Sequence, residues 1–116
     1  MTRLGIIGLS HDHVWDVLPS AAARADVELI AAPSLQPPLL ERAKKEYGVA
    51  TYTDATEMAA SETLDAVLIY GNNRAGAEEG VRALERGWHV LIEKPLAADL
   101  DSADALLNAA NTTGRR

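Results

Sequence analysis

Short apolar runs alternate with segments of helical spacing along the whole chain. The runs fall at residues 4–8, 27–32, 51–52, 66–70 and 90–92. Between them apolar side chains recur at helical intervals, as in Val14, Val17, Leu18 and Ala21. Strands separated by helices pair in parallel, with right-handed crossovers. The alternation therefore predicts an α/β fold: a doubly wound parallel sheet of order 3-2-1-4-5, with helices on both faces.

Local signals mark where the expected helices begin and end. The second helix opens at Pro37-Pro38 and stops at Gly48. Residues 54–57, Asp-Ala-Thr-Glu, are typical of a capping box, and the last helix is expected to be capped by Asp99 or Asp101.

Bulk composition excludes several classes of protein. The length of 116 residues suits one domain, and the formal net charge of −6 argues against a surface for nucleic acid or an anionic membrane. The absence of cysteine excludes disulfides and thiolate metal sites. No apolar run is long enough to span a membrane, and no signal-peptide pattern is present, so we expect a cytoplasmic protein.

The first strand-to-helix turn resembles a degenerate phosphate-binding turn. Gly8 stands at the first glycine position of G-x-G-x-x-G, whereas Ser10 and His13 stand at the second and third. We predict that pyrophosphate binds the backbone of Leu9, Ser10 and His11, because N–H groups at a helix start attract anions. The alternative is an ordinary turn capped by Ser10 or Asp12.

The His11-Asp12-His13 sequence also suggests metal ligands. Two histidines without a third ligand nearby rarely form a metal site. We therefore interpret the triplet as a polar helix start and predict no metal site.

Two further strand ends carry polar groups. After the second strand, Ser34 and Gln36 are candidates to bind the adenosine ribose or a 2′-phosphate, or else to cap the next helix. Because neither a carboxylate nor an arginine is present there, the choice between NAD and NADP stays open. The last strand ends in Glu93-Lys94-Pro95, which predicts a partly buried lysine in the ligand crevice, or alternatively an ion pair beside a turn proline. We also expect a cis Lys94–Pro95 bond.

Residues 83–95 read ALERGWHVLIEKP, which resembles the ALExGKHVxxEKP signature of the Gfo/Idh/MocA oxidoreductases, the relatives of glucose–fructose oxidoreductase and inositol dehydrogenase. Only Trp88 departs from that pattern. Residues 65–69 and Asn72-Asn73 are similar to the strand and TPN-like turn of the family.

The resemblance implies that residues 1–116 form an NAD(P)-binding Rossmann domain and that a larger substrate domain is absent from this chain. It implies hydride transfer with a sugar or polyol, and it allows assembly as a homo-oligomer. Lys94 would be catalytic and would also contact the cofactor, with Glu93 near the nicotinamide and Gly71 and Asn72 along the cofactor groove. The alternative is a non-catalytic nucleotide-binding or subunit-interaction module.

Three departures from the family pattern weaken the implied activity. Ser10 and His13 replace glycines, no acid follows the second strand, and Gly76 stands where the family usually has a histidine. Residues 113–116 resemble the entry to a sixth strand that does not follow. We therefore expect this chain to be inactive on its own.

Overall fold

The computed structural model describes all residues from 1 to 116. Strands and helices alternate without exception, in the order β1 (Thr2–Ile7), α1 (Asp12–Ala22), β2 (Val27–Pro33), α2 (Pro37–Tyr47), β3 (Ala50–Tyr52), α3 (Ala55–Ser61), β4 (Ala66–Ile69), α4 (Asn73–Glu85), β5 (His89–Ile92) and α5 (Leu100–Thr113). No helix is long and apolar enough to cross a membrane.

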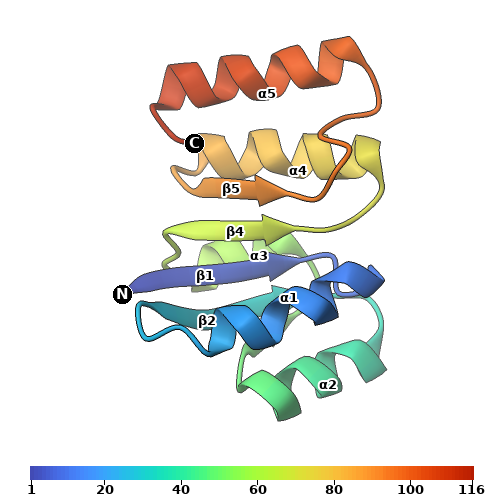
Figure 1. The fold of residues 1–116 in the computed structure, drawn as a ribbon, viewed down its shortest axis with the longest axis vertical. Coiled ribbons are helices and arrows are strands. Elements are labelled where there is room, and N and C mark those ends of the chain that lie inside the picture. Colours follow the sequence, from blue (N-terminus) through green and yellow to red (C-terminus); the bar gives the residue numbers. More distant parts are fainter.

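The strands form one sheet in the order β3-β2-β1-β4-β5, and every pair of neighbours is parallel (Figure 1). The predicted topology is confirmed. The chain starts in the middle of the sheet, moves outward through β2 and β3, and then returns to place β4 on the other side of β1. This reversal creates the switch point at which ligands of such sheets bind.

Successive side chains of a strand point to opposite faces, so the sheet has two cores. Leu4 and Ile6 of β1 pack with Val14 and Leu18 of α1 on one face. On the other face Val67 and Ile69 of β4 pack with residues of α3, α4 and the turn before β5, namely Met58, Ala83 and Trp88. In Figure 1, α1 and α2 lie in front of the sheet and α3 lies behind it.

Helix α5 lies at the end of the molecule, beside α4 and beyond the β5 edge (Figure 1). Its buried residue Leu106 packs with Ala77 and Leu84 of α4 in a small cluster of its own. The close approach depends on Gly80, where an added Cβ would stand 2.6 Å from Leu106 Cδ2 and 2.7 Å from Ile92 Cδ1.

The register brings three strand ends to the same level. Ile7 is paired with Ile69, and Ile69 is paired with Ile92. Hydrogen bonds continue this alignment past the strands: Tyr70 N–H donates to Ile7 O at 2.7 Å, and Glu93 N–H donates to Ile69 O at 2.9 Å. The turns that follow β1, β4 and β5 therefore share one edge of the sheet.

Most of the expected helix signals are confirmed. Asp54 caps α3 and Asp99 caps α5, Pro37 opens α2, and Gly48 closes it with a φ of 69°. The first and fourth strands end one residue earlier than predicted, at Ile7 and Ile69. The Lys94–Pro95 peptide bond is cis, as expected.

The start of α1 differs from both caps considered in the sequence. His11 is the N-cap residue, and its Nδ1 accepts a hydrogen bond from His13 N–H at 3.1 Å. Ser10 and Asp12 were therefore wrong as candidate caps, because the helix begins one residue later than Ser10 requires and one earlier than Asp12 requires.

Candidate cofactor site

The candidate site begins with the turn from β1 to α1, which packs against the end of β4. Gly8 has a φ of +102°, a conformation that side chains beyond glycine rarely adopt. An added Cβ would stand 1.3 Å from Tyr70 O, inside the backbone of the neighbouring strand end. Gly8 therefore serves the turn in two ways, through its backbone conformation and through close packing.

The backbone N–H groups of this turn are only partly available to an anion. Those of Leu9 and Ser10 donate no hydrogen bond within the chain, whereas His11 N–H donates to Gly8 O at 3.1 Å. Leu9 is buried in the core and its carbonyl accepts from the indole N–H of Trp15, so its N–H is the one backbone polar group of this residue without a partner in the chain. The backbone of the turn thus offers two donors next to a helix start, and the expected contribution from His11 N–H is already used.

His13, which stands at the third glycine position of the motif, brings two segments of the site together. His13 Nδ1 lies 2.7 Å from Glu93 Oε2, and Glu93 Oε1 accepts a hydrogen bond from Lys94 N–H at 2.8 Å. Glu93 therefore links the start of α1 with the segment after β5. The sequence showed both residues but not their contact, which no local spacing indicates.

These contacts set the electrostatics of the edge. The hydrogen bond from His13, and next that from Lys94 N–H, lower the pKa of the Glu93 carboxyl below its ordinary value of 4.5. Burial raises the pKa of the Tyr70 phenol above 10.0, and the negative charge of Glu93 raises it further. At neutral pH the edge therefore carries a carboxylate close to a neutral phenol.

Lys94 lies at the same edge but is exposed to solvent, so the expectation of a partly buried lysine is wrong for this chain. The ion pair at the strand end joins Glu93 to His13 and does not involve Lys94. The reason is that Glu93 turns back over β4 toward α1. The Lys94 ammonium is left free to meet a ligand.

The remaining predicted residues shape the loops around the crevice. Ser34 Oγ accepts from Gln36 N–H at 3.1 Å, and Ser34 N–H donates to Tyr52 O at 3.0 Å. Asn72 caps α4 by accepting from Ala75 N–H at 2.8 Å, and Gly71 before it is exposed. The Ser34 hydroxyl and the Asn72 amide each keep a hydrogen to donate to a ligand.

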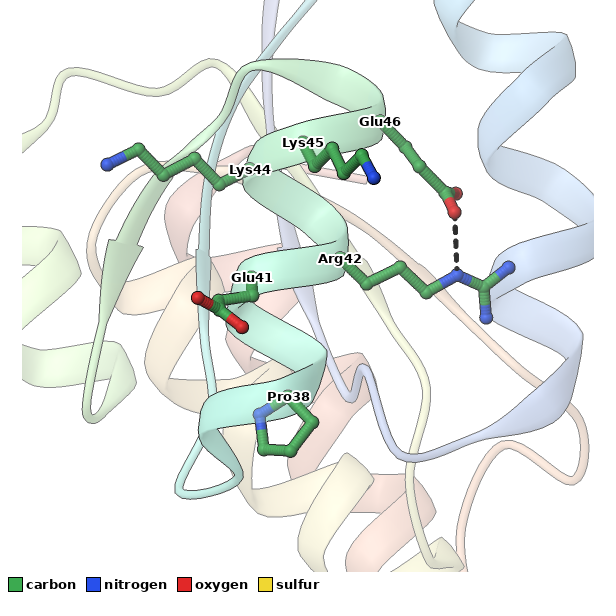
Figure 2. A pocket seen from close by; sticks show the side chains of 6 residues that line it. All are labelled: Pro38, Glu41, Arg42, Lys44, Lys45 and Glu46. Carbon is green, nitrogen blue, oxygen red and sulfur yellow. Dashed lines mark hydrogen bonds and ion pairs between the residues drawn. The ribbon is translucent and has the colours of Figure 1, made fainter.

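The hollows of the surface lie away from this edge. The largest, of about 730 Å³, follows the outer face of α2 and is lined by Pro38, Glu41, Arg42, Lys44, Lys45 and Glu46. Figure 2 shows these side chains spreading away from the helix, with Arg42 paired to Glu46. With no apolar wall, this hollow lacks what a small-molecule site needs, and the open carboxyl edge remains the candidate.

Comparison with known proteins identifies the family. The profile of the family described as "Oxidoreductase family, NAD-binding Rossmann fold" matches residues 2–116. The chain is 35% identical to the NADP⁺-dependent scyllo-inositol 2-dehydrogenase of Bacillus subtilis, covering 98% of this chain and 35% of that protein. An uncharacterized oxidoreductase of Rhizobium meliloti is 33% identical, with coverages of 100% and 35%. The chain thus spans about a third of these relatives.

Solved structures agree in fold. A 3-ketoreductase from Actinomadura kijaniata, crystallised with NADP and TDP-benzene, superposes with a TM-score of 0.89 at 30% identity, over 98% of this chain and 35% of that one. A myo-inositol 2-dehydrogenase from Lactobacillus plantarum gives 0.86 at 31% identity, over 97% and 33%. The chain therefore belongs to the Gfo/Idh/MocA oxidoreductases, as an N-terminal domain with their NAD-binding Rossmann fold.

Proposed function

We propose that this domain serves an enzyme that moves a hydride between NAD or NADP and a carbinol carbon of a sugar or polyol. The observation that carries the proposal is the level register of β1, β4 and β5, which places the glycine turn and Lys94 along one edge. The relatives support the substrate class, since they include an inositol dehydrogenase and a ketoreductase.

Each part of the edge has a distinct task in this proposal. The free N–H groups of Leu9 and Ser10 bind pyrophosphate at the start of α1. The Ser34 hydroxyl donates to the adenosine ribose, while Gly71 and Asn72 line the groove.

At the other end of the groove, Lys94 binds the substrate oxygen through its ammonium group and stabilises the negative charge that develops there, as the hydroxyl proton passes to a base outside this chain or to water. Glu93 lies beside it, near the nicotinamide. The nicotinamide, when bound, supplies the hydride chemistry. The role of the protein is to position the reacting groups and to stabilise charge.

We infer that residues 1–116 form one domain and that the full-length protein has a second domain over the exposed edge. Hydride transfer needs a fixed orientation of the reacting carbons and walls that exclude water. An exposed Lys94 on an open edge supplies neither. We expect this chain to bind cofactor weakly and to turn over no substrate. In our proposal the full-length protein completes the pocket and can assemble as a homo-oligomer.

Calorimetric titration of the chain with NAD, NADH, NADP, NADPH and ADP tests the proposal. We expect one nicotinamide dinucleotide to bind in preference to the others and more tightly than ADP. Equal binding of ADP would favour a non-catalytic nucleotide-binding module, and the absence of binding by all five would contradict both functions.

Two variants of one residue test the pyrophosphate position. Ser10→Ala removes the hydroxyl and keeps Cβ, whereas Ser10→Gly removes both. If Cβ obstructs the pyrophosphate, only Ser10→Gly tightens binding. If the hydroxyl donates to a phosphate oxygen, both variants weaken binding by about tenfold, as expected for a hydrogen bond to a charged group. Unchanged binding in both variants would show that the Ser10 side chain does not contact the pyrophosphate.

A further inference from the structure

Two histidines and a carboxylate meet over the carboxyl end of β4. His11 and His13 come from the start of α1, and Glu93 follows β5, so the residues are brought together by the sheet order. One potential ligand atom from each lies within 4.8 Å of the other two. The His13 side chain is 55% exposed and the Glu93 side chain 18%, so the cluster is reachable from solvent and partly held in place.

We propose that His11, His13 and Glu93 bind a divalent first-row transition metal ion such as Zn²⁺. Two imidazole nitrogens and one carboxylate oxygen form a common set of three protein ligands for zinc, with further positions left open to water or another oxygen. Two histidines alone do not suffice, and Glu93 supplies the third ligand that the local sequence lacks.

The distances permit such a site after small side-chain movements. Metal–ligand bonds of about 2.0–2.2 Å place ligand atoms about 3.3 Å apart in a tetrahedral site. The 2.7 Å contact of His13 Nδ1 with Glu93 Oε2 must open slightly, and the wider separations, which are at most 4.8 Å, must close by at most about 1.5 Å. The exposure of His13 allows this adjustment without movement of the sheet.

Neighbouring groups already orient two of the ligands, as hydrogen-bond and packing partners of the ligands do in metal sites. The Glu93 Oε1 atom accepts from Lys94 N–H, which leaves Oε2 directed at His13. The His11 ring packs edge-on against Tyr70, with centroids 5.7 Å apart. Asp12, in the first turn of α1, opposes the positive end of the helix dipole that would otherwise repel a cation.

One existing contact changes when the metal binds. His11 Nδ1 accepts the cap hydrogen bond from His13 N–H, so the other ring nitrogen carries the proton. Coordination through either nitrogen removes this cap bond, by replacing it or by shifting the proton. We therefore expect affinity in the micromolar range rather than that of a structural zinc site.

Titration of the metal-free chain with Co²⁺ and Zn²⁺ tests the proposal. We expect one ion per chain, with visible absorption of bound Co²⁺ and displacement of Co²⁺ by Zn²⁺. The variants His11→Ala, His13→Ala and Glu93→Gln should each lose at least about tenfold in affinity. His89→Ala is the matched control, because this third histidine begins β5 at the opposite edge of the sheet.

Side-chain NMR of the three histidines gives a readout that does not depend on the stability of the variants. Zn²⁺ should shift the ring signals of His11 and His13 and leave those of His89 unchanged. Equal shifts at all three rings, non-saturating binding, or affinity that survives the loss of His13 and Glu93 would overturn the site. Because no cofactor is present in these titrations, the outcome is independent of the proposed oxidoreductase function.

Discussion

Gly8 occupies the tightest place at the edge of the sheet. Its φ of +102° turns the chain from β1 toward α1, and the missing side chain lets Tyr70 O approach. The neighbouring Tyr70 N–H donates a hydrogen bond to Ile7 O, so the exits of β1 and β4 are joined by this bond as well as by the contact at Gly8. One residue thus fixes the spacing of two loops that the proposed cofactor site needs.

Replacement of Gly8 by alanine should destabilise the fold mainly through the close contact with Tyr70, and less through the positive φ. Gly8→Ala must move the backbone at Tyr70, and we expect a loss of about 3 kcal/mol or more in the free energy of unfolding. Gly48→Ala is the control: its φ is also positive, at 69°, but no atom lies within 4 Å, so a loss of about 1 kcal/mol is expected. Urea unfolding followed by circular dichroism measures both. Similar losses in the two variants would disprove the close contact.

For single residues, the sequence predicted the turn at Gly8 but not the contact that joins the start of α1 to the segment after β5. The position of Gly8 after an apolar run was enough to indicate a strand-to-helix turn. The pairing of His13 with Glu93 spans 80 residues and depends on strand order and side-chain rotamers together. The His11 cap was missed for a related reason, because serine and aspartate are the preferred caps and both were close by.

The packing of α4 against α5 gives a test at the level of secondary structure. At Gly76 an added Cβ would meet Ile69 and Ile92 at 3.9 Å, which is ordinary contact, whereas at Gly80 it would overlap Leu106 and Ile92. Alanine favours a helix over glycine by up to about 1 kcal/mol. We therefore expect Gly76→Ala to be neutral or stabilising.

Gly80→Ala gains the same helix propensity, but its added Cβ crowds the interface between α4 and α5. We expect it to be less stable than Gly76→Ala by at least about 1 kcal/mol, the lower end of overpacking costs. Thermal unfolding of the two variants side by side makes the comparison. Equal stabilities would show that Leu106 and Ile92 move aside freely.

The N-terminus of α5 should respond to acid. The hydrogen bond from Ser102 N–H lowers the pKa of Asp99 below its ordinary 3.8. The Asp99 carboxylate therefore binds a proton more readily in the unfolded chain than in the folded one. The stabilisation that the Asp99 cap contributes is present above about pH 4 and is lost as pH falls through the lowered pKa of the folded state. Asparagine caps equally well without titrating. Asp99→Asn should therefore lose less stability than the wild type between neutral pH and about pH 2.

Asp104→Asn is the matched control for this pH dependence, because Asp104 is exposed in the middle of the same helix and caps nothing. Asp104→Asn removes the same charge without removing a cap, so it should flatten the curve less than Asp99→Asn does. If Asp104→Asn flattened the curve as much as Asp99→Asn, the acid effect would come from net charge and not from the cap.

For the whole molecule, the strand order was predictable because alternation and right-handed crossovers leave few topologies. The position of the candidate site at the carboxyl edge of the sheet was predictable from that order together with the turns at Gly8, Gly71 and Lys94. The exposure of Lys94 was not predictable, because it depends on where Glu93 turns and which surfaces cover the edge. The use of His11 N–H within its own turn likewise depends on backbone geometry that the sequence pattern does not specify.

The small, separate cluster that binds α5 to α4 has a consequence for hydrogen exchange. Leu106 is the only buried residue of α5, whereas β4 lies between two cores. An element with so few buried contacts can open while the rest stays folded. The amide protons of α5 should therefore exchange through a partial opening that leaves Leu68 protected. Under native conditions the chain would then visit a form with four helices docked and the apolar side of α4 bared, and a protease would cut first in the segment between β5 and α5.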